Sequence, residues 1–143
     1  MRKKNIDKWY HTFIDLYSVD VFLYVGDQNK MLSKQYEDFM GEKLKDHQFI
    51  TDSIRSYLGS DDNDSNNWCM PVYDKNRHLH VIICVEQINS KPDIVGVLSH
   101  ECLHAAIFIC NFCGIRDDDS GFESLCYLQE KILTEFYKLK STK

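Results

Sequence analysis

The sequence predicts a small α+β fold, built as a single domain over residues 1–143. A chain of 143 residues leaves little room for a second domain. Hydrophobic residues make up 43% of the chain and aromatic residues 13%, which is enough to bury a core and excludes disorder as its main state. The predicted segments follow one another as helix, strand, helix, hairpin, helix, helix, and this order favours helices packed on a short mixed or antiparallel sheet.

The first half of the chain contains a predicted helix, a strand and a second helical region. In residues 4–18, apolar and aromatic side chains recur at helical spacing, which predicts an amphipathic helix. Residues 20–25 are mostly β-branched or aromatic and end at a Gly-Asp pair, so we expect a buried strand. Residues 31–58 mix apolar and charged residues at roughly helical spacing and predict one or two helices. The Asp-, Asn- and Ser-rich segment 59–67 is expected to be a solvated loop.

The second half contains a predicted hairpin followed by two helices. Residues 68–74 and 78–87 flank a polar tripeptide, which is typical of two strands joined by a turn. Pro71 lacks an amide donor, so the first of these strands is expected at a sheet edge. Residues 92–113 are apolar around most of a helical wheel and precede a glycine stop, which predicts a helix buried on most sides. A last amphipathic helix is predicted over residues 121–140.

The charge balance argues against two classes of partner. The net charge is -5, from 17 Lys and Arg against 22 Asp and Glu, whereas nucleic-acid and anionic-membrane binding need an excess of basic residues. No stretch approaches the roughly 20 uninterrupted apolar residues of a membrane helix. Polar residues interrupt the segment behind the basic start, unlike the apolar region of a signal peptide. We therefore expect a cytoplasmic protein with no nucleic-acid and no membrane partner.

The 6 cysteines are expected to be reduced thiols. The chain shows no export signal, and a core of this size does not need disulfides for stability. Cys110 and Cys113 form a CxxC pair at the end of the predicted buried helix, without a second pair, and are weak evidence for redox or zinc chemistry.

An HExxH motif, His100-Glu101-Cys102-Leu103-His104, lies inside the predicted buried helix. Residues four apart lie on one helical face, so both imidazoles can reach one cation. Glu101, beside the first histidine, can face a metal-bound water and take its proton. Imidazole and carboxylate ligands suit Zn²⁺. The alternative is a pair of hydrogen-bonded or surface histidines.

Catalytic zinc takes three protein ligands, and Glu123 is the best candidate for the third. The connection after the active helix is long enough to return this residue to the level of the metal. Ser120 and Glu123 also fit a capping box, in which the glutamate would instead bond the N-cap amide of its own helix. Two other groups are weaker candidates, since an N-capped solvated loop and surface positions explain them more simply. They are Asp117, Asp118 and Asp119 in the loop, and His78 and His80 on a strand.

At these residues the sequence resembles the zincin metallopeptidases, specifically the gluzincins, whose ligands are the two histidines of HExxH and a downstream glutamate. It is most similar to small, minimal gluzincin-like proteins of phages and bacteria, in which a short loop leads to a Glu-x-x-x-Tyr-Leu pattern, here starting at Glu123. The resemblance covers residues 78–137. It implies a zincin-like domain with a buried active-site helix and a C-terminal helix that bears the glutamate. It implies His100, His104 and Glu123 as zinc ligands and Glu101 as general base.

The sequence also departs from the larger families. Thermolysin-like enzymes carry an Asp one turn after the third ligand, where this chain has Tyr127, so the surroundings of the ligands must be built differently. The longer motif of the metzincins, with Gly and a third His, is absent from the sequence. The edge strand that pairs with substrate in such enzymes would be residues 68–74 or 78–87.

The sequence thus predicts a zinc-dependent hydrolase, expected to be a peptidase acting on a peptide or protein. Tyr127, His78 and His80 are candidates for stabilising the oxyanion, although an aromatic at the edge of the core is the simpler explanation for Tyr127. So short a chain implies a shallow cleft or one completed by a partner protein. Two alternatives stay open: a non-catalytic, zinc-stabilised interaction protein of phage type, and an α+β domain without metal.

Overall fold

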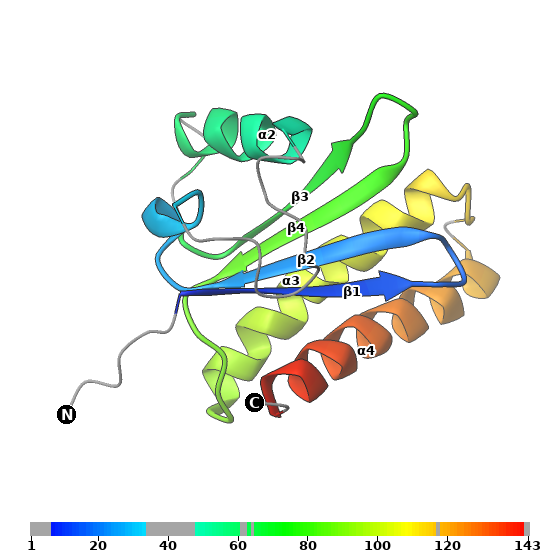
Figure 1. Cartoon of the computed structure of the whole chain (residues 1–143). Helices are drawn as coiled ribbons and strands as arrows, with labels where there is room; N and C mark the ends of the chain where they lie inside the picture. The colour runs from blue at the N-terminus through cyan, green and yellow to red at the C-terminus, as the bar shows by residue number, and fades with distance from the viewer. Residues whose placement is uncertain (1–6, 34–47, 61–62, 64, 117, 142–143) are drawn as a thin grey trace.

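A computed structural model describes residues 7–33, 48–60, 63, 65–116 and 118–141. Its elements in chain order are β1 (Lys8–Ile14), β2 (Val19–Val25), η1 (Gln28–Lys30), α2 (Gln48–Leu58), β3 (Trp68–Tyr73), β4 (Leu79–Val85), α3 (Pro92–Phe112) and α4 (Asp119–Ser141). The strands form one mixed, four-stranded sheet with helices on both sides (Figure 1). The predicted α+β class is confirmed.

The strands lie in the order β1-β2-β4-β3. The two central strands, β2 and β4, pair in parallel, with Leu23 beside Ile83, and each outer strand pairs antiparallel with its neighbour. β3 and β4 form the predicted hairpin. Pro71 lies in the edge strand β3, as predicted, where a missing amide donor is tolerated.

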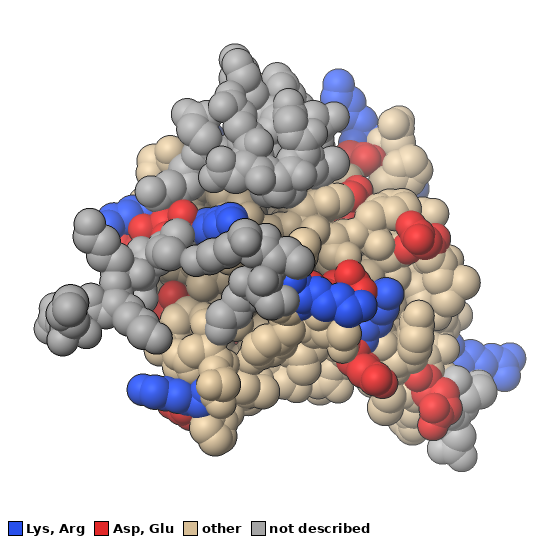
Figure 2. Space-filling view, turned by 60° about the horizontal axis from the view of Figure 1, so that its bottom comes forward, with Lys and Arg blue, Asp and Glu red and all other residues tan. Residues whose placement is uncertain are grey.

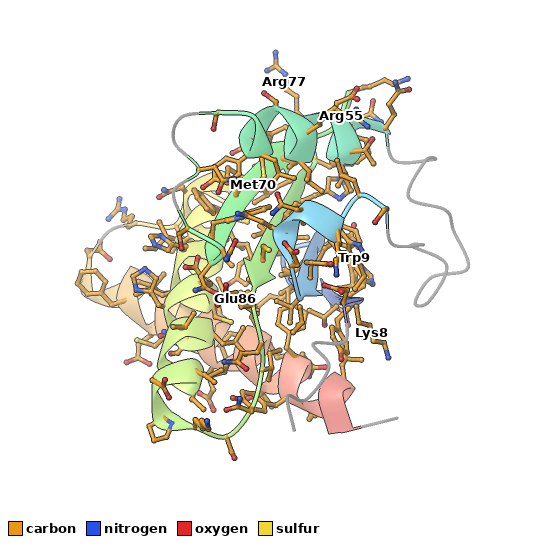
Figure 3. All side chains as sticks on the ribbon, turned by 90° about the vertical axis from the view of Figure 1, so that its left-hand side faces the viewer. Lys8, Trp9, Arg55, Met70, Arg77 and Glu86 are labelled. Atoms are coloured by element: carbon orange, nitrogen blue, oxygen red, sulfur yellow. The ribbon has the colours of Figure 1, made fainter. Side chains whose placement is uncertain are left out.

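Residues 8–14 form strand β1, so the predicted N-terminal helix is wrong; residues 1–6 lie outside the described part. The side chains of β1 alternate between two covered faces, with Trp9 in the core under α2 and Ile14 in the core under α3 and α4. A strand buried on both faces carries apolar residues at both parities, and these imitate helical spacing. Trp9 also donates its indole N–H to the carbonyl oxygen of Met31 at 3.1 Å, which ties β1 to the segment after η1 (Figure 3).

The sheet separates two hydrophobic cores, because α3 and α4 cover one face and α2 with η1 covers the other (Figure 1; Figure 3). In β4 the odd-numbered residues from Leu79 to Val85 belong to the core under α3 and α4. The even-numbered Ile82 and Cys84 belong to the core under α2. The parity of a β4 residue therefore decides which face of the sheet its side chain can serve.

The helices fall close to the predicted ranges. α2 confirms a helix within residues 31–58, of which 34–47 lie outside the described part. α3 ends at Phe112 and is followed by Gly114 at φ +69°, a left-handed position that favours glycine after a helix. α4 begins at Asp119, two residues before the predicted start.

By length and composition alone, α3 is apolar enough to cross a membrane. In the fold it is the core helix, since Leu98, Cys102, Ala105 and Ile109 are buried in the core that it forms with the sheet and α4. Packing against the sheet accounts for its apolar composition.

Acidic and basic side chains are interspersed over the face of the molecule that Figure 2 shows. Among the described residues that Figure 2 shows, Lys and Arg do not gather into one continuous patch of the kind that a phosphate-binding surface needs.

Candidate metal centre

α3 places His100 and His104 one turn apart on its exposed face. The Nε2 atoms of the two rings lie 3.1 Å apart, and the ring planes meet at 73°. The two Nε2 atoms are thus within hydrogen-bonding distance, so that an N–H of one ring can donate to the other. The structure brings the two histidines of the motif together as the sequence predicts.

The histidine pair fits a shared zinc ion. Two nitrogens that are each about 2.0–2.1 Å from a tetrahedral zinc lie roughly 3.3 Å from each other. The observed separation of 3.1 Å is close to this value. The same separation suits a direct hydrogen bond, and the pair therefore matches both a metal site and the alternative of hydrogen-bonded histidines.

Glu101 lies between the two histidines in sequence but on the inner side of α3, with 6% of its surface exposed. Burial raises its pKa, and the neighbouring charges of His104 and His100 oppose this effect only in part. A carboxyl with a raised pKa accepts a proton more readily near neutral pH, which suits a general base. The role of Glu101 as general base stays a prediction.

Two thiols share the surroundings of Glu101. Burial, together with the charge of Glu101, raises the pKa of Cys102 to about 12, and the same two causes hold the pKa of Cys69 well above its usual range. Both cysteines are therefore protonated at neutral pH when no cation is bound.

A pocket of about 470 Å³ opens beside the first half of the motif. It is lined by Ser65, Asn67, Asp93, Gly96, Val97, His100 and Glu101. The loop before β3 forms one wall and is fastened to the end of β4, because Asn67 accepts a hydrogen bond from the backbone N–H of Glu86 and Asn66 donates to the Glu86 carboxylate (Figure 3). Glu101 thus borders a space large enough for a segment of substrate.

Glu123 does not join the histidine pair. It is exposed on α4, and within the described residues no three His, Cys, Asp or Glu side chains form a group that could hold a metal. α4 faces α3 through other positions: Gln129 donates to the backbone carbonyl of Ser99 at 3.0 Å, and Leu128 is fully buried. Glu123 lies about 140° around the helix from Leu128. The described residues therefore bring together only two of the three predicted zinc ligands, and the role of Glu123 stays a prediction.

The predicted capping box of Ser120 and Glu123 is wrong, because Ser120 is not the N-cap residue of α4. α4 begins at Asp119, so Ser120 lies within the first turn instead of at the N-cap. Asp118 takes that position, because its side chain accepts from the backbone N–H of Gly121 and its carbonyl accepts from Phe122. The N-cap is therefore supplied by the Asp-rich loop, as was expected of that loop, while Asp117 lies outside the described residues.

His80 belongs to the opposite face of the sheet and is not available as a ligand beside α3. Its even position in β4 directs it toward α2, where its ring lies 5.0 Å from that of Phe49. Its Nε2 is 3.2 Å from the carboxylate of Asp74, and its Nδ1 is 3.6 Å from that of Asp20. His78 is 70% exposed and also contacts Asp74. These histidines form a network with acidic residues, which the sequence analysis did not foresee.

The remaining candidates lie apart from the pocket. Tyr127 is 49% exposed on α4 and is not among the residues that line the pocket beside Glu101. Cys110 is buried and Cys113 is exposed at the end of α3, and burial raises the pKa of both thiols. All 6 cysteines are free.

Sequence reasoning missed the pocket wall. Asp93 and Gly96 precede His100 by seven and four residues, a helical spacing that places them on its face of α3. Extending the periodicity of the motif toward the start of α3 would have found them. Ser65 and Asn67 give no such signal, because only the tertiary fold brings their loop to α3.

Comparisons of the chain with protein-family models, with curated proteins and with solved structures found no match.

Proposed function

We propose that this protein is a zinc-dependent hydrolase that cleaves peptide bonds. The observation that carries the proposal is the 3.1 Å separation of the His100 and His104 Nε2 atoms on an exposed helix face, with buried Glu101 between them in sequence. A hydrogen-bonded pair explains the histidines but leaves a buried carboxyl unexplained, since burial of such a group is unfavourable without a function or a partner.

In this proposal each residue of the motif has a separate task. His100 and His104 would hold the ion, which supplies an acidified water when bound. Glu101 would accept a proton from that water and pass it to the leaving amine, because its raised pKa brings it closer to the operating pH. The described residues offer two of the three protein ligands usual for catalytic zinc, and Glu123 is proposed as the third.

The edge strand β3 supports a peptide as substrate. It pairs with β4 on one side, and its outer edge has no partner strand within the described residues. An extended peptide can add to such an edge through backbone hydrogen bonds. β3 also contacts α3, which carries the histidine pair, so a peptide on this edge would run past Glu101. We further propose a reducing compartment, the cytoplasm, which suits the free cysteines.

The test combines metal content with peptide cleavage. Purified wild-type protein is expected to bind one zinc per chain and to cleave an unfolded protein, whereas His104→Ala should lose the metal. Glu123→Ala decides the third ligand, since retention of zinc in that variant would remove Glu123 from the site. Glu101→Gln should keep zinc and lose roughly 100-fold or more of the cleavage rate.

The outcome with Glu101→Gln also separates the proposal from its alternative. If zinc binds and the biological effect of the protein persists without Glu101, the protein is a zinc-stabilised interaction protein and not a peptidase. Absence of zinc from wild-type protein, after purification without chelators, would overturn both.

A further inference from the structure

The pocket beside Glu101 has a lining whose charges suit a cation. Its ionisable lining residues are Asp93, His100 and Glu101, and no Lys or Arg lines it within the described part of the chain. Neither carboxylate makes a hydrogen bond or an ion pair with another residue that the structure describes. Glu101 is only 6% exposed, so a buried carboxyl without such a partner faces this space. Burial of that kind is unfavourable unless a ligand of opposite charge can compensate it.

The order of the lining residues along α3 matches a long cationic side chain. Asp93 precedes Glu101 by eight residues, which is about 12 Å along the helix axis. Gly96 and Val97 lie between them, and no atom lies within 4 Å of a Cβ built at Gly96, so this stretch has room for an aliphatic chain. Lys and Arg combine an apolar stem with a charged end. Their stem suits the middle of the pocket, and their charge suits the Asp93 end.

The pocket also adjoins the edge strand that is proposed to pair with a peptide. Asn67 lines the pocket and directly precedes Trp68, the first residue of β3. The charge of Glu101 contributes to the raised pKa of the Cys69 thiol, so Glu101 lies close to the second residue of β3. A peptide on the edge of β3 therefore passes the pocket at the level of Glu101.

We propose that this pocket binds a Lys or Arg side chain of the substrate close to the cleaved bond, and that Asp93 selects it; this inference rests on the proposed function. Asp93 lies about 10.5 Å before His100 along the helix axis. A long, flexible cationic side chain can reach from a peptide beside the histidines toward that carboxylate, whereas a short side chain cannot. An acidic side chain in the same place would be repelled by Asp93 and Glu101.

The experiment uses a series of peptides, blocked at both ends, in which one Lys is moved through the positions on each side of the cleaved bond. Each peptide is compared with the same peptide carrying Gln, which is of similar length but uncharged. Wild-type protein is expected to prefer Lys at one position by about fivefold in kcat/KM, as for one partly exposed ion pair. The preference should decrease toward 1 M salt, where the screening length falls to about 3 Å.

Variants of Asp93 test the assignment of the selecting residue. Asp93→Asn should abolish the preference for Lys, and Asp93→Lys should make the corresponding Glu peptide the better substrate. Glu130→Gln is the matched control, because it removes one acidic charge from an exposed position on α4 that does not line the pocket, and it should leave the preference intact. A ratio of kcat/KM values does not depend on the amount of folded enzyme, so a loss of stability cannot imitate the expected result.

Binding provides a second readout that does not depend on cleavage. In fluorescence anisotropy, Glu101→Gln protein should bind the labelled Lys peptide about fivefold more tightly than the Gln peptide, and a further Asp93→Asn change should remove the difference. Cleavage without any preference for Lys, or a preference that persists in Asp93→Asn, would overturn the role of the pocket and leave the proposed function standing. Selective binding of the Lys peptide without cleavage by wild-type protein would support the pocket and overturn the peptidase.

Discussion

The carboxyl of Glu101 is buried, which makes its ionisation unfavourable and affects the stability of the folded protein. Because its pKa is raised on folding, the folded state binds the proton more tightly than the unfolded state does. The contribution of Glu101 to the free energy of unfolding is therefore largest below its pKa in the unfolded state. That contribution decreases as pH rises through the pKa of Glu101 in the folded state. The same burial that prepares Glu101 as a base lowers the stability of the fold at neutral pH.

Glu101→Gln is accordingly expected to be more stable than wild type at pH 7, in protein freed of metal. Near pH 4 the two proteins should converge, because Glu101 is then protonated in both states. Urea unfolding at the two pH values measures the difference. Glu130→Gln, at an exposed position on α4, is the control and should show little change. A Gln variant that is less stable at both pH values would show that Glu101 makes a stabilising contact instead.

Asp74 shows the opposite shift. Burial alone would raise its pKa, but hydrogen bonds from the His78 backbone N–H, the His80 ring and the Asn76 backbone N–H together lower it. These hydrogen bonds therefore stabilise the folded protein at pH values above the unfolded-state pKa of 3.8. This stabilisation is lost as pH falls through the pKa of Asp74 in the folded state.

Asp74→Asn should lower the free energy of unfolding at pH 7 and flatten its decrease between about pH 5 and pH 2. Chemical unfolding at a series of pH values measures both effects. Asp52→Asn is a suitable control, because Asp52 is 57% exposed and pairs with Arg55 on the surface of α2. Equal acid sensitivity of Asp74→Asn and wild type would contradict the role of the turn hydrogen bonds.

At the residue scale, the sequence could predict contacts within a single helix. It could not predict contacts that depend on how two helices pack against each other. The spacing of His100 and His104 determines their proximity, because a helix is a rigid frame over one turn. The position of Glu123 depends on how α4 rotates against α3, and no local pattern encodes that angle. His80 was misjudged for a similar reason: strand parity groups it with His78 but does not show which face of the sheet α3 covers.

The junction between α3 and α4 depends on a glycine. A Cβ on Gly121 would lie 1.5 Å from the carbonyl oxygen of Arg116, so the first turn of α4 approaches the preceding loop too closely for any side chain. Gly96 is also helical, but no atom lies within 4 Å of a Cβ built there. The two glycines therefore provide a matched pair for testing this packing.

Gly121→Ala should destabilise the protein by several kcal/mol, because backbone must move to admit the methyl group. Gly96→Ala should stabilise it by about 0.5–1 kcal/mol, since alanine loses less conformational freedom in a helix. Thermal unfolding of both variants, followed by circular dichroism, measures these differences. Equal stability of the two variants would show that the start of α4 packs less tightly than described.

At the element scale, the hairpin, the central strand β2 and the helices α3 and α4 were predictable because each has one dominant pattern and a defined end. The edge position of β3 could be predicted from Pro71 alone, because proline lacks the backbone N–H that a central strand needs. β1 was not predictable, since its residues face apolar cores on both sides and their spacing does not distinguish strand from helix. The antiparallel pairing of all seven β1 residues with β2 is what makes this segment a strand.

Across the whole molecule, the candidate site is framed by elements far apart in sequence. Gln129 of α4 holds α3 through the backbone carbonyl and hydroxyl of Ser99, directly before the first histidine. On the other side, Asn67 is fastened to the end of β4 and forms the wall opposite Glu101. A ligand bound to the histidines would therefore be coupled to the stability of the entire fold, because these contacts exist only when the sheet and both helices are assembled.

This coupling predicts that zinc raises the melting temperature. A ligand that binds only the folded state at 100 times its Kd adds about 2.7 kcal/mol, which corresponds to an increase of several degrees for a domain of this size. Differential scanning fluorimetry with zinc, and then with excess chelator, measures the shift. His104→Ala should abolish it, while His78→Ala, an exposed histidine at the β3–β4 turn, should retain it. Glu123→Ala should reduce the shift if the glutamate completes the site. A zinc-dependent shift that survives in His104→Ala would place the ion elsewhere and contradict the proposed centre.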